Sequence, residues 1–161
     1  MTETLKERAR EIFEAGGGEP VEGTKFLPLV TLESEARCGI DSKLTWISVP
    51  TDGRPIARGE PGQEHLLYEV LETKRDDFEK KLAEGARAAG LPPDDTVLAF
   101  PAVAVIRAVL EKELAYLTKL ALQWALPSEL RELRADILKV AAARNIPTPV
   151  KEMAKRLVVP E

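Results

Sequence analysis

Apolar residues near the start of the chain recur with the spacing of a helix. They fall at i, i+4, i+7 and i+8 and are Leu5, Ala9, Ile12 and Phe13. This spacing puts them on one helix face. Thr4 and Glu7 form a capping-box pattern, and Thr2 is the alternative cap. The glycine run at 16–18 predicts the end of this helix and a flexible linker over 16–20.

Residues 24–58 have the pattern of strands. The segments "TKFLPLVTL" and "KLTWISV" are rich in β-branched and aromatic residues, which favour strands. Pro28 cannot donate a ladder hydrogen bond, so its strand is an edge strand or is broken there. Asp52-Gly53 is a tight-turn signal, and "PIAR" after it predicts a short third strand. These features predict an antiparallel sheet of two or three strands that needs a helix packed on one face.

From residue 63 onward the apolar positions follow a helical period. The first predicted helix covers 63–89 and ends at Gly90 and the Pro92-Pro93 pair. The next begins between Asp94 and Pro101 and runs to about Leu126, with 96–100 as a possible separate element. A third begins at 127–128, and a short last helix opens at 148–149. The segment therefore predicts a bundle of about four helices.

Together these elements predict an α+β fold in a single domain over 1–161. Residues 1–60 form the N-terminal helix and the small antiparallel sheet, and residues 63–161 form the helical bundle. A chain of 161 residues is long enough for one domain with a core. Its content of 44% hydrophobic and 31% charged residues is typical of soluble globular proteins.

Charge and cysteine content narrow the class of protein. The net charge of −4 argues against a dedicated nucleic-acid scaffold, which carries a basic excess. One cysteine and the absence of a long apolar run in the sequence lead us to expect a cytoplasmic protein without a membrane segment. Few Asn and Gln among many charged residues are typical of a thermophilic protein, and a high-GC genome gives a similar bias.

The sequence offers little catalytic chemistry. The single His65 and the single Cys38 cannot build a Cys/His zinc site. His65, Glu69 and Glu72 would share one helix face, but the Glu-x-x-His pattern of bundle metal sites is missing, which favours a solvated face. We expect no catalytic residue, no metal ligand and no cofactor, and an enzyme is the less favoured class.

Glu113 is the residue that raises a functional question. It lies in "VLEKELAYL" (109–117), near the middle of the apolar face of the predicted helix. An unpaired buried carboxylate is costly, so we predict a buried ion pair with Lys74 or Arg75, which interrupt the stripe of the preceding helix. The alternatives are a polar pair at an oligomer interface and a catalytic carboxylate with a raised pKa.

Two further sets of residues suggest partners. Trp46 and Trp124 are candidate interface anchors, since tryptophan is enriched at binding hot spots. The C-terminal helix pair over 128–158 looks like the second half of a helix-turn-helix, or like a helix-extension-helix unit of the SAP type, and could reach nucleic acid. Its candidate contacts are Arg144, Lys151, Lys155 and Arg156.

These observations favour a non-catalytic protein-interaction or regulatory module that forms a homo-oligomer. The predicted helix to Leu126 is apolar on almost all sides and must be covered by partners or by its own bundle. The alternative is a DNA-binding regulator using the helix pair at 128–158. A third possibility is a small metal-dependent or carboxylate-based enzyme around Glu113 and His65. Nucleic acid is thus a possible but not favoured partner, and we expect no membrane partner.

Overall fold

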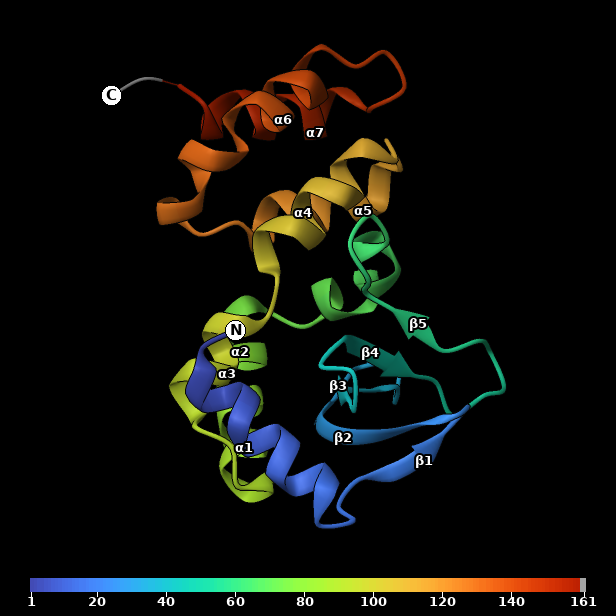
Figure 1. The fold of residues 1–161 in the computed structure, drawn as a ribbon. Coiled ribbons are helices and arrows are strands. Elements are labelled where there is room, and N and C mark those ends of the chain that lie inside the picture. The colour runs from blue at the N-terminus through green and yellow to red at the C-terminus, as the bar shows by residue number, and fades with distance from the viewer. Residues whose placement is uncertain (160–161) are drawn as a thin grey trace. The chain divides into compact units, whose positions relative to one another are not determined.

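The computed structural model describes residues 1–159, which fall into two compact units. The N-terminal unit covers Met1–Phe100, and the C-terminal unit begins at Pro101. Figure 1 shows a mixed sheet-and-helix arrangement for the first and helices for the second. The fold is therefore α+β, as the sequence predicts. The predicted subdivision at 60–63 does not coincide with these units, because the helices between residues 64 and 99 belong with the sheet.

The N-terminal unit is a sheet accompanied by helices. Its elements are α1 (Glu3–Glu14), β1 (Glu19–Val21), β2 (Thr24–Thr31), β3 (Arg37–Asp41), β4 (Trp46–Val49), β5 (Ala57–Arg58), the 3-10 helix η1 (Glu64–Glu72), α2 (Arg75–Ala89) and α3 (Pro93–Ala99). Thr2 caps α1, because its side chain accepts a hydrogen bond from the Leu5 backbone N–H at 3.2 Å. The cap is therefore the alternative considered from the sequence, Thr2, and not the capping box of Thr4 and Glu7.

The sheet is an antiparallel meander of five strands in the order β1-β2-β3-β4-β5, not the predicted two or three. β1 arises from part of the expected linker. Its hairpin to β2 turns at Glu22-Gly23, where both residues have positive φ, as tight hairpin turns require. β3, the other additional strand, contains the single cysteine, Cys38.

β3 can pair with β2 only because Gly39 has no side chain. A Cβ atom at this position would lie 1.9 Å from the Leu27 carbonyl oxygen. The pairing of β2 with β3 also shifts register between Pro28 and Val30. Pro28 pairs with Gly39 of β3 but lies beyond the residues of β2 that β1 pairs, so β2 is an edge at this position and needs no N–H on that side.

The predicted helix over 63–89 is two helices. η1 ends at Glu72, and Thr73 and Lys74 are extended before α2 begins at Arg75. α2 packs against β2 and provides the helix that the sheet needs. It ends at Gly90, which has a left-handed conformation with φ of 87°, as the sequence predicts. The short α3 confirms that a separate element precedes Pro101.

The C-terminal unit consists of α4 (Ala102–Glu111), α5 (Ala115–Trp124), the one-turn 3-10 helix η2 (Pro127–Glu129), α6 (Leu130–Ala142) and α7 (Thr148–Leu157). α6 packs against both α4 and α7. Its stripe of Leu133, Ile137 and Val140 is buried as predicted. The predicted continuous helix to Leu126 is wrong, because α4 and α5 are separated by a turn at 112–114.

Within residues 1–159, none of the helices combines the length and the apolar character that crossing a bilayer would require.

Candidate binding groove

The turn between α4 and α5 has an unusual residue at its centre. Lys112 caps the C-terminus of α4, and Glu113 follows with φ of 52°. This left-handed position after a helix is most often glycine, because a Cβ atom costs about 1–2 kcal/mol there. The Glu113 backbone N–H donates to the Leu110 carbonyl oxygen at 3.3 Å and closes the turn. The chain thus keeps a glutamate where glycine would be more stable.

The predicted burial of Glu113 is wrong. Its side chain is exposed, because α4 ends two residues earlier and the apolar face on which it was placed does not continue. The reason to expect a counter-ion from Lys74 or Arg75 disappears with the burial. Lys74 is exposed, and the Arg75 Nε lies 3.6 Å from a carboxylate oxygen of Glu79 in its own helix.

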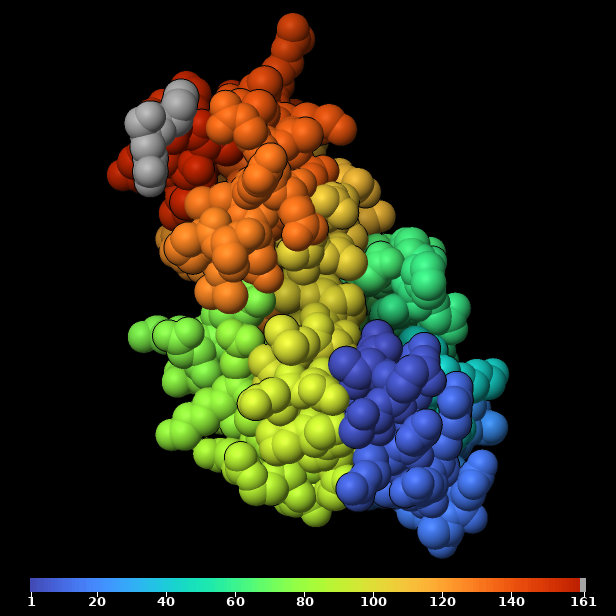
Figure 2. All heavy atoms as spheres, turned by 60° about the vertical axis from the view of Figure 1, so that its left-hand side comes forward, coloured from blue at the N-terminus to red at the C-terminus, as the bar shows by residue number. Residues whose placement is uncertain are grey.

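Glu113 instead lines a groove on the surface of the C-terminal unit. We call it the acidic groove and define it by Leu110, Glu111, Glu113, Asp136, Lys139 and Val140. Its volume is about 230 Å³. The groove is formed by α4, its following turn and α6, and Figure 2 shows α6 (orange) beside α4 (yellow).

The acidic groove combines an apolar floor with a charged rim. Leu110 and Val140 are buried and form the floor. The Asp136 carboxylate accepts a hydrogen bond from the Arg107 Nε at 3.0 Å, so an ion pair already balances this charge. The remaining lining charges are the exposed carboxylates of Glu111 and Glu113 and the exposed ammonium of Lys139. The rim therefore keeps a net negative charge.

Large apolar side chains are exposed at sequence positions close to the groove residues. Leu114 follows Glu113 and is 55% exposed, Tyr116 of α5 is 63% exposed, and Leu138 of α6 is 44% exposed. Isolated apolar residues are common on protein surfaces, but exposed apolar residues near a concave site favour a binding surface.

The candidate nucleic-acid residues lie at the other end of this unit's sequence. Arg144 is exposed in the connection between α6 and α7, and Lys155 and Arg156 are exposed on α7. Lys151 is half-buried. The Lys155 Nζ lies 3.3 Å from the Glu152 carboxylate, which partly offsets the positive charge. The residues thus give a modest basic surface and not an extended basic face.

The two tryptophans are not exposed. Trp46 is 4% exposed, and its ring meets that of Phe100 edge-to-face with centroids 5.1 Å apart. Trp124 is 2% exposed. Neither indole is accessible to a partner in this conformation, so the interface prediction for these residues is corrected. The C-terminal unit has an exposed aromatic residue in Tyr116 of α5, which the sequence analysis did not single out.

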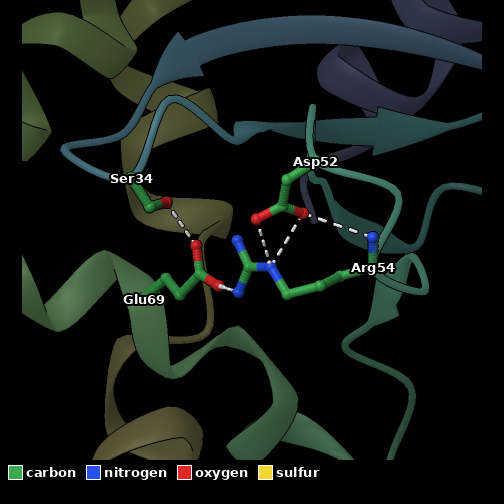
Figure 3. A network of polar contacts seen from close by, with 4 residues as sticks. All are labelled: Ser34, Asp52, Arg54 and Glu69. Carbon is green, nitrogen blue, oxygen red and sulfur yellow. Dashed lines mark hydrogen bonds and ion pairs between the residues drawn. The ribbon is translucent and has the colours of Figure 1, made fainter.

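A second polar site connects three segments of the N-terminal unit (Figure 3). Arg54, in the connection from β4 to β5, donates from Nε to Asp52 at 2.8 Å and from Nη1 to Glu69 at 2.5 Å. Ser34, in the hairpin between β2 and β3, donates its hydroxyl to the other oxygen of Glu69. The network therefore fastens two loops to η1.

The electrostatics of this network argue for a structural role. The hydrogen bonds from Arg54 hold the pKa of Asp52 below its usual value, and Asp52 and Glu69 raise the pKa of Arg54. The pKa of Asp52 is lower in the folded protein than in the unfolded chain. Its ionised form therefore stabilises the fold at pH values above the unfolded pKa, and this stabilisation is lost as the pH falls through the folded pKa. Both oxygens of Glu69 are engaged in the network, one by Arg54 and the other by the Ser34 hydroxyl.

The cysteine and the carboxylates considered as catalytic or metal-binding groups have structural surroundings. Burial raises the pKa of the Cys38 thiol to about 12, so it is not a thiolate nucleophile at neutral pH. Glu69 is buried in the network above, which corrects the expectation of a solvated face shared with His65 and Glu72. Across the described part of the chain, no three His, Cys, Asp or Glu side chains are grouped as a metal site would need.

A smaller recess in the N-terminal unit is a weaker candidate for a binding site. It has a volume of about 220 Å³ and is lined by Met1, Thr2, Asp95, Leu98 and Ala99. The Thr2 hydroxyl donates to the Asp95 carboxylate at 2.9 Å, so its two polar side chains satisfy each other. The acidic groove keeps two carboxylates available and is the stronger candidate.

Comparison with protein-family models, curated proteins and solved structures gives no match to this chain.

Proposed function

We propose that this protein is a non-catalytic protein-interaction module that binds its partner at the acidic groove. The observation that carries the proposal is Glu113. Its left-handed backbone makes it less stable than glycine at the same position, and its carboxylate lies on the rim of the groove. Glu22, Glu35 and Leu44 also have positive φ, but of these four residues Glu113 is the one that lines the groove. Strained backbone on a concave surface supports a binding role, because such residues cluster at functional sites.

The surroundings of the groove support a protein partner over a small molecule. Its volume of about 230 Å³ lies below the range of roughly 300–1,000 Å³ that is usual for small-molecule sites. Leu114 and Tyr116, one and three residues after Glu113, are exposed apolar side chains close to it in sequence. An apolar centre with an aromatic residue and a charged rim is the usual composition of a protein interface.

Photo-crosslinking tests this proposal. Tyr116 is replaced by p-benzoylphenylalanine, and the protein is irradiated in a lysate of the cells that produce it. We expect a discrete crosslinked product, because the side chain at 116 would lie against the partner. The matched control places the same group at Leu98 of α3, which is 81% exposed in the N-terminal unit. Equal labelling at both positions, or none at Tyr116, would count against the proposal.

A further inference from the structure

We infer that the acidic groove binds the segment Lys155–Val159 of a second copy of this chain. The inference rests on the proposed function and names the partner. This segment comprises the end of α7 and the two residues after it. It combines the two kinds of side chain that the groove can accept, two cations and an exposed aliphatic group.

The charges of the two surfaces are complementary. Glu111 and Glu113 are exposed on the rim, and no ion pair within residues 1–159 engages either carboxylate. Lys155 and Arg156 are exposed in the segment. The Lys139 ammonium on the rim opposes the approach of a cation, but the Arg107–Asp136 pair is neutral, so two acidic charges face one basic charge. Arg156 would therefore meet a net attraction, and Lys155 adds to it when its Nζ leaves the Glu152 carboxylate, which lies 3.3 Å away.

The apolar parts of the two surfaces also fit. The floor of the groove is formed by Leu110 and Val140, and Val159, two residues after the end of α7, is 64% exposed. A groove of about 230 Å³ admits side chains but not a helix. Insertion of the Val159 side chain would remove apolar surface from water on both copies, which stabilises the contact.

The segment is held in place on its own copy. α7 packs against α6, and the Val158 carbonyl oxygen accepts a hydrogen bond from the Arg134 Nη1 at 2.8 Å. The lining of the groove comes from α4, the following turn and α6. Reciprocal exchange of the segment between two copies would close a dimer, and a non-reciprocal contact would join copies in a ring or a chain. We therefore expect assembly that grows with protein concentration.

Sedimentation velocity of the purified full chain with paired charge reversals tests the inference. The groove variant carries Glu111→Arg with Glu113→Arg, and the segment variant carries Lys155→Glu with Arg156→Glu. Each should associate about tenfold or more weakly than the unchanged protein, because the two surfaces then carry the same sign. A mixture of the two variants in equal amounts should associate again, because each variant then meets a surface of opposite charge.

The control variant is Glu11→Arg with Glu14→Arg, which makes the same charge change on exposed positions of α1. It should associate like the unchanged protein. Monomers at all concentrations, unaltered assembly of the groove and segment variants, or no recovery in the mixture would each overturn the inference. The proposed function is judged separately, since crosslinking of Tyr116 to a different protein would support it even if the purified chain is monomeric.

Discussion

Replacing Gly85 with alanine is expected to destabilise the N-terminal unit by about 3 kcal/mol or more. Gly85 lies inside α2, where alanine normally stabilises a helix by about 0.5–1 kcal/mol. At position 85 alanine should instead destabilise the protein. A Cβ atom at position 85 would lie 1.9 Å from the Leu29 carbonyl oxygen and 2.7 Å from its carbon. α2 would have to move away from β2, and the buried contacts between them would be lost.

Urea unfolding followed by circular dichroism measures this effect. The matched control is Glu84→Ala, an exposed substitution one position earlier in the same helix, which should change the free energy of unfolding by less than about 0.5 kcal/mol. A Gly85→Ala protein as stable as the control would show that α2 does not lie this close to β2.

Replacing Asp41 with alanine is expected to cost about 2–4 kcal/mol of stability. Asp41 is 1% exposed at the end of β3. Its Oδ1 accepts the backbone N–H groups of Lys43 at 3.0 Å and Thr45 at 2.9 Å, and its Oδ2 accepts from the Arg58 Nη1 at 3.3 Å. Alanine would leave two backbone donors without their acceptor in the turn before β4.

Asparagine at the same position separates the contribution of the hydrogen bonds to the turn from that of the ion pair with Arg58. Asp41→Asn keeps an oxygen for the backbone donors and removes the charge that faces Arg58, so it should cost less than Asp41→Ala. Chemical unfolding gives both values, and amide exchange at Thr45 reports the turn directly. Equal losses for the two variants would mean that the hydrogen bonds to the turn are not the main contribution of Asp41.

Elements with a strong local signal were predictable from the sequence. The face of α1, the glycine that ends α2 and the proline-bounded α3 all depend on residues within a few positions of one another. The start of α7 at Thr148 also depends on residues that are close in sequence. β1 and β3 were missed because neither has a run of β-branched residues, and Gly39 of β3 is required only by the approach of Leu27 on the neighbouring strand.

The break at Glu113 was not predictable from periodicity. No glycine or proline occurs at 112–114, so a continuous helix was the natural interpretation. The apolar residues that seemed to surround one helix come from two, α4 and α5, which present different faces to their neighbours. The same limit applies to Arg54 and Glu69, whose ion pair depends on the folding of a loop onto η1.

The most direct test of the account is the substitution Glu113→Gly, with stability and partner binding measured on the same protein. Glycine removes the strain of the left-handed backbone and should raise the free energy of unfolding by about 1 kcal/mol. It also removes a carboxylate from the acidic groove, so crosslinking from position 116 and self-association should both weaken. The matched control is Glu35→Gly, because Glu35 is also left-handed, with φ of 68°, in a hairpin of the N-terminal unit. It should gain similar stability and bind unchanged. A Glu113→Gly protein that is more stable and binds as well as the unchanged chain would contradict the account.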